Sequence, residues 1–458
     1  MDANGDVLRS AADHACRFHR TLDDRPVRAH ASYEELRNAL GGPLPQEGQP
    51  DVEVIAELIG AAEAGIVGSQ TGRYFGFVTG SALPASVAAD WLATAWDQNG
   101  FSVVSSPAAA AAEDVAAGWL VELLGLPEGV SSGFVTGAQA ANTTALAAAR
   151  HHVLAGAGWE VARDGLMGAP RVRILAGAER HVTIDRALRL LGFGTGCLEL
   201  VPADGQGRLR SDPLRDALED RAGPTIVCAQ AGNVNTGACD PLAEIAEACE
   251  SAGAWLHVDG GFGLWAAASP RFRDLVEGHE RADSWATDAH KWLNSPYDSG
   301  LVFCRHVDAH AEAMAVAASY LQRAGGRSPS DWVPESSRRA RGFAVWAALR
   351  SLGSSGVAEL VDRCCEHARN FATLLGATRD VEILNDVVLN QVLVRFAGSD
   401  ETTREVVRRV QQDGTCWVGA TEWQGRTAMR ISVSSFRTDA TDVERSVAAI
   451  LTAAVGVR

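Results

Sequence analysis

Apolar side chains recur at helical spacing near the start of the chain, over residues 7–18, and the proline- and glycine-rich stretch 41–50 ends that pattern. This spacing predicts an amphipathic N-terminal helix that forms an arm of the molecule. Over 83–126 the chain is rich in alanine and keeps a helical period. We therefore expect packed helix over this stretch rather than a linker.

Beyond residue 130, short apolar or β-branched runs alternate with helical stretches, of which 140–154 and 241–251 are the clearest. The apolar runs cover residues 133–135, 172–175, 225–229, 255–258 and 300–303. This alternation predicts an α/β domain built on a mainly parallel sheet. Ligands of such sheets bind beyond the carboxyl ends of the strands, so we expect the reactive residues directly after these runs.

The C-terminal part of the chain has a different pattern. A helix predicted over 357–375 precedes two strand-like runs, 387–396 and 427–433, which is typical of a small α+β domain. We therefore expect three parts, which are an N-terminal arm used in dimerisation (1–82), a large domain (83–352) and a small C-terminal domain (353–458).

The chain of 458 residues carries 41 basic and 57 acidic side chains, and its formal net charge of −16 opposes binding to nucleic acid or to an anionic membrane. Hydrophobic residues make up 47% and charged residues 21%, as in folded globular proteins. Residues 1–20 lack the apolar core of a signal peptide, and no run reaches the ~18 apolar residues of a membrane span. We expect a soluble, cytoplasmic protein whose nine cysteines, without a C-x-x-C pair, are reduced thiols and hold no metal.

Of the 41 basic residues a single one, Lys291, is lysine. Arginine can replace lysine at most solvated positions, but it cannot lose its proton and form an imine. Lys291 lies in the segment Asp288-Ala-His-Lys-Trp292. Chance survival of one surface lysine is the alternative, and the neighbouring segments favour an imine-forming lysine instead.

The segment His257-Val-Asp-Gly-Gly261 places Asp259 where an apolar run ends. A carboxylate at the end of a buried strand needs a partner. A protonated pyridine nitrogen is one candidate, because an aspartate that keeps the ring cationic makes the ring an electron sink. Capping of the following turn is the alternative.

Two further elements point to a phosphorylated aromatic ligand. The small-residue turn within 134–143 separates a predicted strand from a helix, and backbone N–H groups at such a helix start bind phosphate. His181 follows the run 172–175 and can stack on an aromatic ring. A structural histidine is the alternative there.

Together and in this order, these elements resemble the group II pyridoxal-phosphate-dependent amino acid decarboxylases, which include aromatic amino acid and glutamate decarboxylases. The resemblance extends from Arg73 to the C-terminus. It implies the aspartate aminotransferase-like fold (fold type I), pyridoxal 5′-phosphate as cofactor, an amino acid substrate and a homodimer with shared active sites. It also implies that Lys291 binds the cofactor aldehyde as an imine, that Asp259 pairs with the ring nitrogen, and that His181 stacks on the ring.

The same resemblance implies the remaining contacts. Cofactor contacts are expected from Ala138, Gln139 and His290 at the phosphate and from Asn233 near the phenolic oxygen. Substrate contacts are expected from Phe77, Val78 and Thr79, and from Phe101 donated across the dimer interface. The sequence departs from the family pattern where Gln139 and Ala140 replace a Ser/Thr-Glu pair, and where Asn233 replaces threonine.

A larger departure lies in the loop after the lysine. Family members that act on aromatic amino acids carry a tyrosine in this mobile loop, and it is held to reprotonate the substrate carbon. The matching loop lies between Tyr320 and Arg338 and has Pro329 in the place of that tyrosine.

We expect decarboxylation of an L-amino acid, with an aromatic or other apolar side chain favoured by the apolar pocket residues. The nearest alternatives are decarboxylation-coupled oxidative deamination to an aldehyde, or another pyridoxal-phosphate-dependent reaction on an amino acid. A dinucleotide-binding protein would need G-x-G-x-x-G, which neither 192–196 nor 260–263 provides. A non-catalytic scaffold would have no need of Lys291, Asp259 and His181 together.

Overall fold

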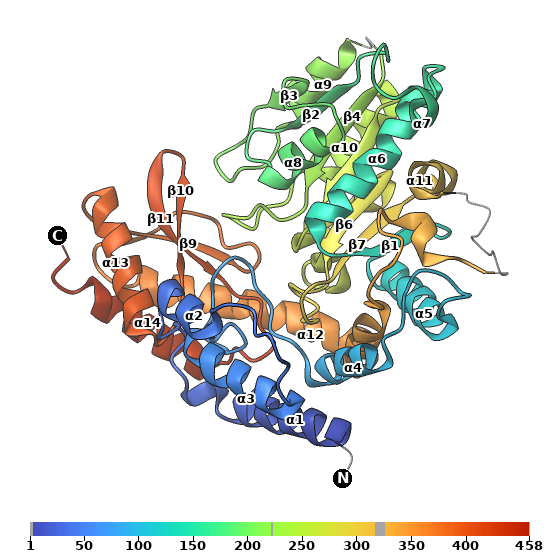
Figure 1. Ribbon diagram of the computed structural model, residues 1–458. Coiled ribbons are helices and arrows are strands. Elements are labelled where there is room, and N and C mark those ends of the chain that lie inside the picture. Colours follow the sequence, from blue (N-terminus) through green and yellow to red (C-terminus); the bar gives the residue numbers. More distant parts are fainter. Residues whose placement is uncertain (1–2, 221–222, 317–325, 458) are drawn as a thin grey trace.

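The computed structural model describes residues 3–220, 223–316 and 326–457, and Figure 1 shows two sheets within them. The larger sheet has seven strands in the order β1-β7-β6-β5-β4-β2-β3. All neighbouring pairs are parallel except those of β7, which runs antiparallel to β1 and to β6. The strands are β1 (Ser131–Val135), β2 (Arg173–Gly177), β3 (Leu198–Val201), β4 (Thr225–Gln230), β5 (Trp255–Asp259), β6 (Ser284–Asp288) and β7 (Gly300–Cys304).

Helices cover both faces of this sheet, because alternate side chains of its central strands are buried on opposite sides. In β4, Ile226 packs in one buried cluster with Ile184 of α8, whereas Val227 packs in another with Ile245 of α10. Burial on both faces explains why these strands read as continuous apolar runs. The helices around the sheet are α6 (Ala138–Gly156), α7 (Val161–Asp164), α8 (Val182–Leu190), α9 (Ser211–Glu219), α10 (Leu242–Ala252) and α11 (Val307–Met314).

The chain before the sheet is helical, as its period predicts, but the expected helix over 83–126 is interrupted. Asp97 adopts a left-handed conformation (φ 46°), and α5 starts only after the loop 98–106. Pro107 occupies the first turn of α5, where its missing N–H leaves no helical hydrogen bond unmade. The helices are α1 (Ala3–Arg20), α2 (Tyr33–Leu40), α3 (Asp51–Ala62), α4 (Pro84–Trp96) and α5 (Pro107–Leu123).

The C-terminal part contains a four-stranded antiparallel sheet in the order β10-β11-β9-β8. Its strands are β8 (Val381–Ile383), β9 (Gln391–Phe396), β10 (Gly419–Trp423) and β11 (Arg426–Ser432), so the expected strand over 387–396 begins later than the apolar run. The helices are α12 (Gly342–Gly376), α13 (Asp400–Asp413) and α14 (Ala440–Ala454). Gly353 kinks α12 with a φ of 64°, at the residue where the small domain is predicted to begin.

Short 3-10 helices connect the larger elements. They are η1 (Leu22–Asp24), η2 (Glu63–Gly65), η3 (Gly263–Ala268), η4 (Arg273–Val276), η5 (His279–Arg281) and η6 (Pro329–Trp332). The predicted division at residues 82 and 352 stays a prediction.

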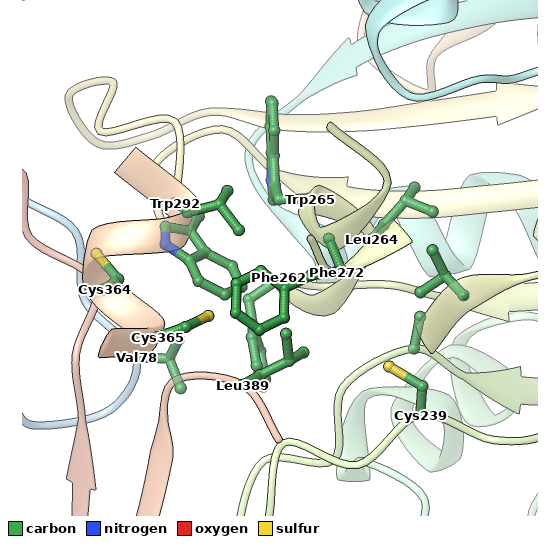
Figure 2. Close-up of a cluster of buried hydrophobic side chains, with 14 of the residues drawn as sticks. Val78, Cys239, Phe262, Leu264, Trp265, Phe272, Trp292, Cys364, Cys365 and Leu389 are labelled. Atoms are coloured by element: carbon green, nitrogen blue, oxygen red, sulfur yellow. The ribbon is translucent and has the colours of Figure 1, made fainter. Parts of the chain in front are cut away.

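One buried hydrophobic cluster contains residues of both sheets and of the helices packed on them. Figure 2 shows the part of this cluster around Trp292, Phe262 and the sulfur atoms of Cys364 and Cys365. Trp292 follows Lys291 directly and is 1% exposed. Within the same cluster, the indole nitrogen of Trp265 donates a hydrogen bond to the carbonyl of Asp288 (3.0 Å). Because rings of this size bury ~150–250 Å² each, this packing fixes the loop that carries the lysine.

Candidate active site

The carboxyl ends of two neighbouring parallel strands carry the reactive residues. Asp259 is the last residue of β5 and Asp288 the last of β6, and Lys291 follows three residues later. A cavity of about 260 Å³ opens at this edge of the sheet, close to the lower end of small-molecule pockets (~300 Å³). Six of the seven predicted cofactor contacts line it: Ala138, Gln139, His181, Asp259, His290 and Lys291.

Lys291 is held by the carboxylate of Asp288. Its Nζ lies 2.9 Å from Asp288 Oδ2, and Asp288 Oδ1 accepts the backbone N–H of Ala138 (2.5 Å). Asp288 is 2% exposed, whereas about a fifth of the Lys291 side chain is exposed (21%) and reaches the cavity. The carboxylate therefore links the lysine to the first turn of α6.

Asp259 is fixed by three donors. Its Oδ2 accepts from Asn142 Nδ2 (3.1 Å) and from the Thr183 hydroxyl (3.3 Å), and its Oδ1 accepts the N–H of Gly261 (3.3 Å). Hydrogen bonds to a carboxylate stabilise its charged form. Asp259 thus faces the cavity as an oriented acceptor.

His181 caps the start of α8, and its Nδ1 contacts the Thr183 hydroxyl at 2.9 Å. Burial lowers the pKa of His181; the nearby cations Lys291 and Arg430 act in the same direction, whereas Asp259 opposes them. A lowered pKa keeps the imidazole neutral at pH 7, which suits a ring that packs against another ring.

The turn at the start of α6 forms the predicted phosphate side of the cavity. Gln139 Nε2 donates to the Thr183 carbonyl (3.3 Å), while Gln139 Oε1 is buried without a hydrogen-bond partner among the described residues. His290 Nδ1 accepts the N–H of Ser299 (3.2 Å), and burial lowers the pKa of His290. A Cβ on Gly137 would meet the His290 ring at 3.2 Å, so glycine permits this close approach.

Sequence reasoning did not identify Arg430 of β11. Its guanidinium donates to the carbonyl of Val234, which lines the cavity (3.1 Å), and its charge acts on His181. Burial lowers the pKa of Arg430 and no carboxylate opposes this shift, so it has no ion-pair partner within the described parts of the chain. One arginine among 40 gives no sequence signal, so only the fold could reveal it.

Tyr297 is a second residue that the sequence did not single out. Its ring lies against that of His290, with centroids 4.4 Å apart and the planes tilted by 33°, and its hydroxyl hydrogen bonds with Thr79. Although 60% of Tyr297 is exposed, the protein around its phenol raises the pKa of Tyr297 by desolvation, and Thr79 and Lys291 oppose that shift. The phenol therefore stays protonated at neutral pH and lies within electrostatic reach of the lysine.

The other predicted contacts lie outside the cavity. Phe77 and Val78 both have positive φ (57° and 62°), which turns Phe77 outward (71% exposed) and Val78 into the core cluster of Figure 2. Asn233 is 1% exposed, and its side chain holds its own turn and donates to the Glu179 carbonyl (3.0 Å). Phe101 lies in the loop before α5.

The predicted lid is described only from Gly326 onward; Tyr320 and Gly325 lie outside the described residues. Pro329 is buried at the start of η6, and the N–H of Ser330 donates to the carbonyl of Phe101 (3.0 Å). The described part of the lid thus contacts the loop that carries a predicted substrate residue.

A lysine and an aspartate at adjacent strand ends, with a histidine and a small-residue helix start around one cavity, define a pyridoxal-phosphate enzyme of fold type I. The chain belongs to the pyridoxal-dependent decarboxylase family, whose conserved domain matches residues 35–397. This membership confirms the predicted family, enzyme class and cofactor, and it establishes amino acid decarboxylation as the activity.

Two relatives illustrate the two reactions expected from the sequence. Tryptophan decarboxylase 1 of Oryza sativa subsp. japonica is 27% identical over 471 residues, covering 94% of this chain and 90% of that protein. Phenylacetaldehyde synthase of Arabidopsis thaliana is 24% identical over 453 residues, covering 94% and 91%. The crystal structure of Oryza sativa TDC with PLP and tryptamine superposes with a TM-score of 0.92 at 24% identity over 99% of this chain and 98% of that one, which confirms the predicted fold.

The residues present fit pyridoxal phosphate. Space is kept open beside the lysine by Gly261, because a Cβ there would lie 3.3 Å from Lys291 Nζ. The start of α6 and the oriented carboxylate of Asp259 border the same cavity as Lys291. An amine, an anion site and a carboxylate acceptor are the groups that the cofactor's aldehyde, phosphate and ring nitrogen require.

Proposed function

We propose that the substrate is an aromatic L-amino acid and that Lys291, Asp259 and His181 carry the reaction. The main observation behind these roles is that the chain's single lysine and the carboxylate of Asp259 border the same cavity. Support for the aromatic side chain comes from the apolar residues beside the site, such as Phe262 and Val234, and from the relatives' names.

Each residue then has a defined task. Lys291 binds the cofactor aldehyde, Asp259 holds the proton on the ring nitrogen, and His181 packs on the ring. Ala138, Gln139 and His290 hold the phosphate. Asn233 lies near the phenolic oxygen of the cofactor ring. The bound cofactor supplies an electron sink for the pair released with carbon dioxide.

Arg430 orients the substrate. It is a partly buried guanidinium beside the cavity with no carboxylate partner within the described residues, and a guanidinium binds carboxylates through parallel hydrogen bonds. The substrate carboxylate is the anion that pairs with the guanidinium of Arg430. Phe77, Thr79 and the partner-donated Phe101 complete the substrate contacts, and Val78 supports them from the core.

Tyr297 donates the proton that replaces the carboxylate on the substrate carbon. Its phenol is protonated at neutral pH, hydrogen bonds with Thr79 and lies against the ring of His290, the residue before the lysine. Pro329, by contrast, offers no proton. If Tyr297 does not act, oxygen captures the electron pair and an aldehyde, ammonia and peroxide result, which is the alternative reaction.

A product screen tests this proposal. Each L-amino acid is incubated with the holoenzyme in air, and carbon dioxide, amine, aldehyde, ammonia and peroxide are measured, with Lys291→Arg as the inactive control. We expect carbon dioxide and amine from aromatic substrates. Release from acidic or basic amino acids alone would contradict the substrate assignment.

We further propose a homodimer. Helix α3 buries none of its side chains within its own chain although it is apolar, and Val52, Val54 and Leu58 are 44–50% exposed. Apolar side chains of α4 are exposed as well, including Trp96 (52%). Exposed apolar faces of this kind mark association surfaces. Light scattering should give a dimer, and Leu58→Glu should weaken it whereas Met167→Glu should not; a fully active monomeric parent would contradict the claim.

No helix among residues 3–220, 223–316 and 326–457 is long and apolar enough to cross a membrane. We propose a cytoplasmic location, supported by nine cysteines that are all free, seven of them buried. Cell fractionation that places the protein in an oxidising compartment would contradict it.

A further inference from the structure

A chain of hydrogen bonds leads to Asp259 through side chains that do not line the cavity. Trp255 Nε1 lies 2.9 Å from Ser284 Oγ, which lies 3.0 Å from His257 Nδ1. His257 Nε2 lies 3.0 Å from Asn142 Oδ1, and Asn142 Nδ2 donates to Asp259 Oδ2 (3.1 Å). The first four residues are at most 2% exposed.

The proton positions along this chain follow from the chemistry of its ends. A carboxylate only accepts, so the amide nitrogen of Asn142 faces Asp259 and its oxygen faces His257. His257 Nε2 therefore carries a proton. Burial lowers the pKa of His257 to about 4, so the ring is neutral at pH 7 and its Nδ1 accepts from the Ser284 hydroxyl.

The other end of the chain agrees with this direction. The indole of Trp255 can only donate, and it donates to Ser284 Oγ. Every donor from Trp255 to Asn142 thus points toward Asp259. The second N–H of Asn142 is also used, since it donates to the Thr183 hydroxyl (3.1 Å), so the amide cannot flip without breaking three hydrogen bonds.

We propose that His257 and Asn142 are positioning residues, which lock the carboxylate of Asp259 in the orientation that receives the cofactor's ring nitrogen. The proposal rests on the role of Asp259 in the proposed function. A neutral chain supplies oriented dipoles without a second charge, so it stabilises the negative charge on Asp259 and leaves that charge for the ring. Packing alone does not explain the chain, because buried polar groups are costlier than apolar side chains of the same size.

The test compares His257→Phe with His257→Gln. Phenylalanine keeps the volume but removes the donor to Asn142, so its amide is free to turn its oxygen toward Asp259. Glutamine restores an N–H near the position of Nε2. We expect His257→Phe to weaken pyridoxal phosphate binding to the apoprotein about tenfold, the effect of losing an orienting hydrogen bond to a charged group. His257→Gln should stay within about twofold.

A double-mutant cycle separates positioning from packing. In an Asp259→Asn background, His257→Phe should change the cofactor dissociation constant by less than about twofold, because its effect acts through the carboxylate. His279→Phe is the matched control, since His279 is a buried histidine (8% exposed) whose ring bonds the backbone carbonyls of Val276 and Leu124 and lies 3.5 Å from Glu280 Oε2, and none of these residues lines the cavity. It should lower the melting temperature of the apoprotein and leave cofactor affinity unchanged.

Equal weakening by His257→Phe in both backgrounds would overturn the positioning role, and so would equal weakening by the Phe and Gln variants. Asn142→Leu provides an independent check should His257→Phe not fold, and it should weaken binding in the parent background only. In another outcome, the parent protein binds the cofactor and releases carbon dioxide while the effects of His257→Phe and Asp259→Asn on cofactor binding are additive. That result would refute the positioning role and leave the proposed function standing. A parent that binds no cofactor would overturn both this inference and the proposed function.

Discussion

Arg338 sits behind the loop that carries Phe101, and its replacement by methionine is a demanding test of the structure. Its guanidinium donates to Glu113 Oε2 (2.7 Å) and Oε1 (3.3 Å) and to the carbonyls of Gly100 (3.1 Å) and Phe134 (2.9 Å). The side chains of Arg338 and Glu113 are 1% and 2% exposed. Arg338→Met fills a similar volume but leaves a buried carboxylate and two carbonyls without this donor.

Breaking a buried ion pair by removing one partner costs about 3–5 kcal/mol. Arg327 remains 3.5 Å from Glu113 Oε1, so the lower end, about 3 kcal/mol, applies. Burial already raises the pKa of Glu113, and Arg338 opposes this shift. Without Arg338 the folded-state pKa rises further above its unfolded value, so the carboxyl's contribution to stability is greatest at low pH and is lost as pH rises through the folded pKa. The variant should therefore lose most stability at pH 8 and recover part of it at pH 5.

Thermal unfolding at both pH values is the assay, and at pH 8 a loss of about 3 kcal/mol lowers the melting temperature by roughly 3–5 °C in a protein of this size. The double variant Glu113→Gln/Arg338→Met removes both charges and should regain most of the loss. Arg404→Met is the surface control, because Arg404 and Glu401 form an exposed pair (53% and 76%). A loss that is independent of pH, or as small as in the control, would refute the assignment of a buried, charged pair.

Three further changes test the site. Asp259→Asn should fold and bind cofactor but lose activity by about 10²-fold or more, because a neutral amide cannot hold the ring proton; steady-state rates within a few-fold of the parent would contradict its role. Tyr297→Phe should lower the yield of amine and raise aldehyde, ammonia and peroxide, and an unchanged product ratio would assign the proton to another group. Pro329→Tyr adds a phenol to the lid and should move the ratio toward amine in the Tyr297→Phe background; no movement would show that the lid does not reach the substrate.

Most strands of the large sheet were predictable, because strands that are buried on both faces consist mainly of consecutive apolar residues. The runs before Asp259 and within β7 were located to within a few residues, and the two-sided packing of β4 explains why. Strands with exposed faces left no such signal. Strands β3, β8 and β10, with partly exposed residues, were not predicted for that reason, whereas β6 is buried throughout and was missed because its serine, threonine and aspartate interrupt the apolar run.

The site residues close to motif positions were also predictable, because strand ends of a parallel sheet meet at one edge. Lys291, singled out as the chain's single lysine, borders one cavity with Asp259 and His181, which were placed after predicted apolar runs. Residues that act through tertiary contacts were not. Asn142 is one small polar residue within a helix, and Arg430 comes from the other sheet; only folding brings Asn142 to Asp259 and Arg430 to Val234 beside the cavity.

The helical stretch 83–126 shows a further limit of pattern reading. Its alanine-rich period hides the break at Asp97, whose left-handed conformation ends α4. Phe77 and Val78 are a second example of a local conformation that the pattern does not show. Their two successive positive φ values form a turn that changes which of the two side chains faces the core. Local conformations of this kind depend on packing around them, which the one-dimensional pattern does not contain.

Borohydride reduction followed by peptide mapping tests the central claim most directly. The holoenzyme is reduced, digested and analysed by mass spectrometry, with Lys291→Arg treated in parallel. Because the chain has a single lysine, the pyridoxyl group should appear on Lys291 alone and be absent from the variant. An enzyme that releases carbon dioxide from an amino acid while Lys291 stays unlabelled would contradict the account.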